Sequence, residues 1–146
     1  MTDRTQGSIE IQAAPARVMT VIADYGAYPE WVQGMKAVRV LETDARGRGR
    51  RVAFHVSTAG IEARYTLTYS YAPRSSGVSW TSTDASGAVK GVEGEYELQP
   101  TAGGTMVSYR LSLDLAISLP GFLRRQAEKT IVTSALANLK TRVESG

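Results

Sequence analysis

The stretch PGFLRRQAEKTIVTSALANLKTRVE, from Pro120 to Glu144, decides the fold of this 146-residue chain. Its apolar residues recur at the spacing of one helix face, which predicts a long amphipathic helix. The stripe comprises Leu123, Ala127, Ile131, Ala135, Leu139 and Val143, widened by Phe122, Val132 and Leu136. Charged residues such as Arg124 and Glu128 are expected on the other face. At 1.5 Å per residue the helix is about 37 Å long, so it must lie against most of a small domain.

From Ala37 to Gly121 the apolar residues instead recur every second residue, the period of half-buried strands. The clearest run is residues 61–71, in which Tyr65, Leu67 and Tyr69 share one face. Strands are predicted at residues 8–12, 38–40, 51–57, 61–71, 78–82, 92–99 and 107–117. Because turns of a few residues join most of them, neighbouring strands must pair antiparallel.

Two short helices are predicted after the first strand. Pro15 and Pro29 each suit the first turn of a helix, and Trp31 lies in the second helix. The resulting fold class is α+β: a seven-stranded curved antiparallel sheet that grips the long C-terminal helix, with two short helices after strand 1. The apolar face of the sheet and the apolar stripe of the helix must bury each other. We expect residues 1–146 to form a single domain.

Composition excludes several kinds of chemistry. The chain has no cysteine, which excludes disulfides, thiolate metal sites and cysteine nucleophiles. A net charge of +3, spread over the whole length, favours no particular partner. No window reaches the roughly 18 apolar residues of a membrane span, so a cytoplasmic protein is expected. Fourteen glycines and the excess of arginine over lysine are typical of a GC-rich bacterial source.

The titratable residues do not form a catalytic pattern. His55 is the only histidine, and its position in the alternation puts it on the polar face of its strand. Glu93, Glu95 and Glu97 are also expected to face solvent, so no inward carboxylate pair is predicted. We therefore predict no catalytic residue, no metal site and no cofactor.

Four short stretches indicate a family. They are Ile9-Glu10-Ile11-Gln12-Ala13-Ala14-Pro15-Ala16-Arg17-Val18, Asp24-Tyr25-Gly26-Ala27-Tyr28-Pro29-Glu30-Trp31, Gly94-Glu95-Tyr96-Glu97-Leu98 and Ala135-Leu136-Ala137-Asn138-Leu139-Lys140. With the order of elements, they resemble the helix-grip fold of the START-like (SRPBCC), polyketide cyclase/dehydrase and coenzyme Q-binding superfamily. The resemblance covers nearly the whole chain. It implies an apolar cavity between sheet and long helix, where lipids, quinones, polyketides or hormones bind.

The inward face of the predicted sheet carries aromatic rings with hydroxyl groups. Such side chains suit a mostly apolar pocket with a few orienting hydrogen bonds. The alternative interpretation is that they simply fill the core. The predicted ligand-binding residues are Tyr65, Tyr69, Trp80, Ser82, Tyr96, Tyr109, Phe54, Trp31, Ile131 and Ala135.

The leading hypothesis is binding or transport of an apolar small molecule, such as a lipid, quinone, isoprenoid or polyketide-like compound. The alternative is a polyketide cyclase, dehydrase or aromatase that acts in the same cavity. Aromatase/cyclase members carry Trp-x-Ser-x-Arg on a cavity strand, and the matching residues are Trp80-Thr81-Ser82-Thr83-Asp84. Asp84 replaces the arginine, which speaks against ring-closing catalysis.

Two surfaces suggest partners. Phe122, Arg124 and Arg125 follow an apolar connection and could rest on a membrane during ligand transfer. A hairpin with Arg46, Arg48, Arg50 and Arg51 could bind phosphates, although a solvated turn is favoured and nucleic acid is not an expected partner.

Overall fold

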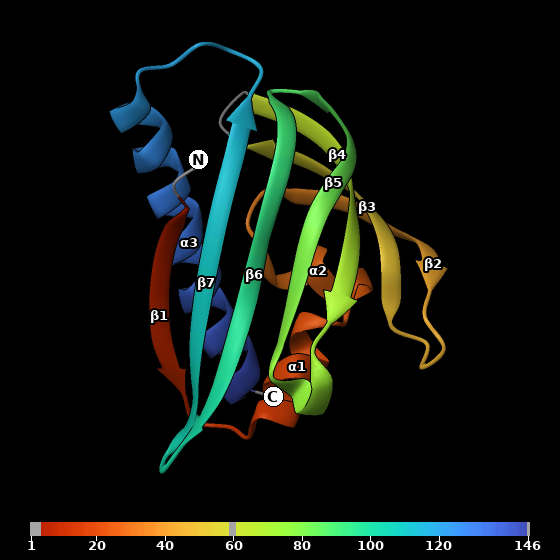
Figure 1. Ribbon diagram of the computed structural model, residues 1–146, viewed down its shortest axis with the longest axis vertical. Helices are drawn as coiled ribbons and strands as arrows, with labels where there is room; N and C mark the ends of the chain where they lie inside the picture. The colour runs from red at the N-terminus through yellow and green to blue at the C-terminus, as the bar shows by residue number, and fades with distance from the viewer. Residues whose placement is uncertain (1–3, 59–60, 146) are drawn as a thin grey trace.

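A single antiparallel sheet, in the order β1-β7-β6-β5-β4-β3-β2, curls around the long helix α3 (Figure 1). The computed structural model describes residues 4–58 and 61–145, of which Thr58 and Ile61 are described by their backbone alone. The strands are β1 (Thr5–Ile11), β2 (Met35–Thr43), β3 (Gly49–Thr58), β4 (Ile61–Tyr71), β5 (Gly77–Gly87), β6 (Val89–Thr101) and β7 (Gly104–Leu115). The helices are α1 (Pro15–Ile22), α2 (Tyr28–Trp31) and α3 (Gly121–Ser145), with single 3₁₀ turns η1 (Tyr25–Ala27) and η2 (Pro73–Ser75).

The predicted fold class is confirmed: the sheet has seven antiparallel strands, and two short helices follow the first strand. The first strand pairs with the last, with Thr5 opposite Leu111 and Ile11 opposite Thr105. Helix α3 packs on β1 and β7, whereas α2 packs on β2 at the other edge of the sheet. The concave face is therefore covered by helices from both sides, and the space between them becomes the interior.

Several strand boundaries differ from the prediction. β1 begins at Thr5 rather than Ser8, and β5 continues through Asp84 to Gly87. β7 ends at Leu115, so Ile117 lies in the connection to α3 instead of in the strand. The alternation of Leu115 and Ile117 suggested more strand, but β6 begins at Val89, opposite Leu115, and offers no further partner. The turn predicted at residues 58–60 falls mostly outside the described residues.

The buried face of α3 matches the predicted stripe at Val132, Leu136, Leu139 and Val143 and differs from it elsewhere. Its buried residues are Glu128, Val132, Leu136, Leu139 and Val143. Leu123 and Ile131 are exposed, although the four-residue repeat placed both toward the sheet. A strict four-residue repeat drifts by about 40° around an α-helix at each step, so one straight contact cannot follow it over six positions. The prediction of Glu128 on the solvated face is wrong, because this carboxylate is completely buried.

Candidate functional site

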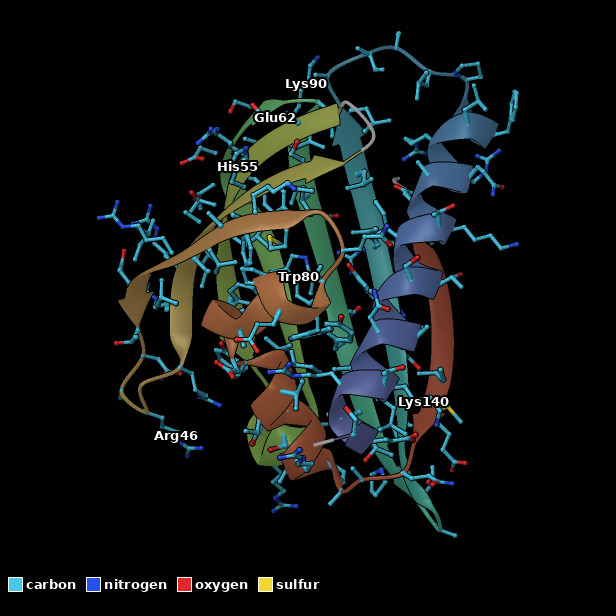
Figure 2. The ribbon with its side chains drawn as sticks, turned by 180° about the vertical axis from the view of Figure 1, so that it is seen from behind. Arg46, His55, Glu62, Trp80, Lys90 and Lys140 are labelled. Carbon is cyan, nitrogen blue, oxygen red and sulfur yellow. The ribbon has the colours of Figure 1, made fainter. Side chains whose placement is uncertain are left out.

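A cavity of about 270 Å³ lies between the concave face of the sheet, the α2 region and α3. Strands β3 to β7 supply most of its wall, the segment from Tyr28 to Met35 closes one side, and α3 supplies Ile131 and Ala135. Figure 2 shows Trp80 in the interior, between the sheet and the helices. The full lining is Ile22, Tyr28, Trp31, Val32, Gln33, Met35, Phe54, Val56, Tyr65, Leu67, Tyr69, Trp80, Val92, Tyr96, Tyr109, Ile131 and Ala135.

Nine of the ten predicted ligand-binding residues are brought together in this lining. Ser82 is the exception, because it does not line the cavity. The pairing of β5 with β6 ends at Thr81 and Glu93, and the Ser82 hydroxyl accepts a hydrogen bond from the Val92 N–H at 3.0 Å. A register shift between Thr66 and Leu67 lies on the other side of this strand. The hydroxyl thus replaces a missing backbone partner.

The remaining lining residues were not selected from the sequence. Val56, Leu67 and Val92 share the strand parity of the predicted residues, so the alternation contained a signal for them. Val32, Gln33 and Met35 lie around the end of α2, where no periodic pattern applies. Only the folding of this segment against α3 places them at the cavity.

The aromatic rings form a connected cluster around the cavity. Tyr96 and Tyr109 have ring centroids 4.7 Å apart, and Trp80 lies 5.4 Å from Tyr96 and 5.7 Å from Tyr109. Trp80 sits directly over Gly94, where a Cβ atom would lie 2.8 Å from the indole ring. Glycine at this position therefore lets the indole lie flat on the sheet. Phe54 and Tyr65 stack at 5.5 Å on the neighbouring strands.

The hydroxyl groups of the cluster fall into two sets. Those of Tyr25, Tyr28 and Tyr71 bond within the protein; for example, Tyr71 donates to the Gly49 carbonyl oxygen at 2.7 Å. Within the described residues, the hydroxyls of Tyr65, Tyr69, Tyr96 and Tyr109 have no protein partner. The buried indole N–H of Trp31 likewise has none there. The cavity wall thus presents polar groups whose hydrogen-bonding capacity is unused.

Burial keeps these phenols neutral. It raises the pKa of Tyr65 to about 12 and the pKa of Tyr69 and Tyr109 well above the ordinary value of 10. Burial also raises the pKa of Tyr96. Among the described residues, the cavity lining contains no charged side chain and no histidine. The site can therefore enclose an apolar ligand and offer neutral hydroxyl and N–H groups for hydrogen bonds with it.

The cavity is open to solvent on one side. Gln33 and Ile131 are the lining residues with the greatest exposure, and 42% of Ile131 is accessible. Gln33 follows α2 and Ile131 lies midway along α3, so the opening lies between these two segments.

The other candidate groups lie away from the cavity. His55 Nε2 is 3.3 Å from Glu62 Oε2, and both residues are close together at one end of the sheet in Figure 2. In the part of the chain that the structure describes, no three metal-ligating side chains gather at one place. The arginine hairpin is largely compensated: Arg51 pairs with Glu42 at 2.7 Å and Arg48 with Asp44 at 2.9 Å.

Comparison with known proteins agrees with this geometry. The family described as "Polyketide cyclase / dehydrase and lipid transport" matches residues 2–144. The chain belongs to this family. Its members include both lipid transport proteins and polyketide cyclases, so membership by itself leaves the ligand open. No curated protein is detectably similar in sequence.

Solved structures similar to this family member span both kinds of protein. A START superfamily protein from Mycobacterium smegmatis superimposes with a TM-score of 0.88 at 17% identity, covering 97% of each chain. The Zhui aromatase/cyclase from Streptomyces sp. R1128 has a TM-score of 0.79 at 16% identity, covering 99% of this chain and 94% of that one. A STAR-related lipid transfer protein from Xanthomonas axonopodis has a TM-score of 0.71 at 18% identity, with 95% and 84% covered. At these identities the likeness shows the fold alone.

Proposed function

We propose that this protein binds and carries a neutral, largely apolar small molecule in the cavity between the sheet and α3. The observation that carries the proposal is the lining itself: a cavity of about 270 Å³ with aromatic and aliphatic walls and, among the described residues, no charged side chain. A ligand that loses about 300 Å² of apolar surface gains about 7 kcal/mol before association costs. Burial alone can therefore supply useful affinity.

The size of the cavity bounds the ligand. Pockets for drug-sized ligands span about 300–1,000 Å³, and this cavity lies just below that range. The ligand is therefore compact, or it is a longer chain of which one segment is enclosed. The rest of a long-chain ligand could extend into solvent through the opening between Gln33 and Ile131.

The unused polar groups narrow the chemistry further. Four phenol hydroxyls and the Trp31 N–H are able to donate hydrogen bonds to a ligand. A carbonyl or ether oxygen can accept these hydrogen bonds, whereas a carboxylate finds no cation among the described residues of the lining. We therefore place a neutral oxygenated compound, such as a quinone, a prenol or a polyketide-like ring system, ahead of a free fatty acid.

Cyclase, dehydrase or aromatase activity in the same cavity is the second candidate. Hydroxyls that converge on an enclosed ring system favour it, since they could orient carbonyl and enol groups. Against it, the described residues of the lining include no carboxylate, histidine or lysine that could act as general acid or base. Asp84 is exposed and also stands where the aromatase/cyclase pattern has arginine. Binding is therefore the function that the site supports better.

A carrier must also exchange its ligand with the compartment that holds it. A membrane contact around Phe122 and Arg125, at the start of α3, belongs to this proposal as the means of exchange. Within the described residues, no helix is both long and apolar enough to cross a bilayer.

The cavity is tested with a substitution that fills it. Ala135 lines the cavity, whereas Ala137, two residues along α3, is exposed. We expect Ala135→Trp to weaken binding of the neutral fluorescent probe N-phenyl-1-naphthylamine by about tenfold or more, because the indole occupies the ligand volume. Ala137→Trp should bind the probe like the wild-type protein.

Native mass spectrometry of the protein purified from bacteria gives an independent reading. A retained neutral lipid or quinone in the wild-type protein, absent from Ala135→Trp, supports the carrier. Equal probe binding by the two tryptophan variants would refute ligand binding in this cavity.

A further inference from the structure

The connection between β7 and α3 carries apolar side chains that nothing in the described structure covers. Ile117 is 63% exposed and Phe122 is 65% exposed, with Leu119 and Leu123 beside them in sequence also exposed. Four such residues within seven positions are unusual on the surface of a soluble domain, where apolar residues are normally scattered singly. We name Ile117, Leu119, Phe122 and Leu123 the apolar tip.

The apolar tip lies at one end of the molecule. In Figure 1 the connection arches over the end of β7, and the first turns of α3 extend past the start of β1. Backbone hydrogen bonds fasten neighbouring turns there: Ala116 N–H donates to the Ala88 carbonyl oxygen, and Ala88 N–H donates to that of Glu62, both at 2.9 Å. The apolar tip therefore projects from an end of the sheet that these backbone hydrogen bonds hold together.

Uncompensated cations surround the tip. Arg125 and Lys129 follow Phe122 at three and seven residues, so all three lie on one side of α3. Lys90 lines a depression beside Ile117 and Leu119, together with Asp114 and Arg124, and Figure 2 shows it at this end of the molecule. Among the described residues, Lys90, Arg125 and Lys129 form no ion pair. Asp114 is the only carboxylate among the described residues that line this depression.

Arg124 has a different role from the one predicted. Its guanidinium lies 3.7 Å from the buried Glu128 carboxylate, so it turns toward the protein. The cations available to a partner are therefore Arg125, Lys129 and Lys90 rather than the Arg124–Arg125 pair.

We propose that the apolar tip docks the protein onto the surface of an anionic lipid bilayer, with Ile117 and Phe122 inserted at the level of the headgroups and Lys90, Arg125 and Lys129 on lipid phosphates. Exposed aliphatic and aromatic side chains ringed by cations suit this interface, because insertion and charge attraction add. The inference rests on the proposed carrier function for its purpose, although the tip and the cavity are separate sites with separate tests.

Sedimentation of the full chain with vesicles tests the docking. We expect binding to phosphatidylcholine vesicles that contain phosphatidylserine and weaker binding to phosphatidylcholine alone, with the difference shrinking at high salt. Ile117→Ser/Phe122→Ser should bind about tenfold more weakly or worse, because it removes the most exposed apolar surface. The matched control is Val40→Ser/Leu41→Ser, which removes two exposed apolar side chains from β2 and should bind like the wild-type protein.

Substitution of two cations beside the apolar tip is the second test of docking. Arg125→Gln/Lys129→Gln should weaken binding to the anionic vesicles about thirtyfold. Arg39→Gln/Arg46→Gln lowers the net charge equally from exposed positions on and beside β2 and should leave binding unchanged. Equal binding by tip and control variants would overturn the proposal. A different result would also overturn it: the wild-type protein forms a dimer in solution and does not bind vesicles, and Ile117→Ser/Phe122→Ser abolishes the dimer. The apolar tip would then contact a second copy of the chain.

The cavity and the tip are separable in the same preparation. Tip variants should retain the wild-type affinity for N-phenyl-1-naphthylamine, and Ala135→Trp should retain vesicle binding. Failure of one arm therefore leaves the other hypothesis standing.

Discussion

At the scale of single residues, Glu128 has the environment least expected from the sequence. Its carboxylate accepts hydrogen bonds from the Thr5 hydroxyl and from the Leu113 N–H, both at 2.7 Å. Leu113 lies two residues beyond Leu111, the partner of the first residue of β1. No described residue of β1 lies opposite Leu113, and the Glu128 side chain bonds its N–H instead. This carboxylate thereby links α3 to both β1 and β7.

Removing the Glu128 carboxylate should lower the stability of the fold. Glu128→Ala leaves a half-buried hydroxyl, a buried N–H and the Arg124 guanidinium without their acceptor, so we expect the free energy of unfolding to fall by about 3 kcal/mol. Urea denaturation followed by circular dichroism measures it. Glu128→Gln keeps one acceptor oxygen and should lose about half as much. Glu93→Ala on the exposed face should change the value by less than about 0.5 kcal/mol. A Glu128→Ala result equal to Glu93→Ala would contradict this role.

At the scale of elements, the contact of α3 with β1 depends on a close approach of side chains of α3 to the backbone of β1 at Gly7. A Cβ atom placed on Gly7 would lie 2.8 Å from Val132 Cγ1 and 3.3 Å from Leu136 Cδ1. The buried residues of α3 from Glu128 to Val143 follow spacings of three and four, which keeps them on one side of the helix. At the other end of the helix, Lys140 Nζ donates to the Glu10 carbonyl oxygen at 2.9 Å.

Gly7→Ala should therefore destabilise the protein. Val132 is β-branched and buried, so it has few ways to move aside. We expect the free energy of unfolding to fall by about 1–3 kcal/mol, as for an overpacked core. Gly26→Ala is the matched control, because nothing lies within 4 Å of a Cβ atom at that glycine. Similar urea midpoints for the two variants would show that α3 does not press on β1 at Gly7.

At the scale of the whole molecule, the tyrosines of the core link stability to alkaline pH. Burial raises the pKa of Tyr65 to about 12, whereas a tyrosine in the unfolded chain ionises near 10. The folded state therefore keeps this proton longer than the unfolded state. The corresponding stability is fully present below pH 10 and is lost as the pH rises from about 10 to 12. Tyr69, Tyr96 and Tyr109 act in the same direction.

We expect the free energy of unfolding to fall steeply over this range and the tyrosinate absorbance to appear together with the loss of circular dichroism. Tyr65→Phe should make the fall less steep and leave stability at neutral pH within about 1 kcal/mol. The measurement is urea denaturation at a series of pH values. Tyrosinate absorbance that develops near pH 10 in a protein with a native spectrum would disprove burial of these hydroxyls.

The sequence by itself determined the fold class and most of the cavity lining. Alternation placed Tyr65, Tyr69, Tyr96 and Tyr109 on one face of the sheet because strand side chains point to opposite sides in turn, which is a local property of the backbone. Only the tertiary structure decided that Leu123 and Ile131 of α3 are exposed, that Ser82 bonds to Val92 rather than facing the cavity, and that Glu128 lies inside. Those outcomes depend on where one strand ends beside another and on a shift in pairing register, and such relations between distant segments leave no period in the chain.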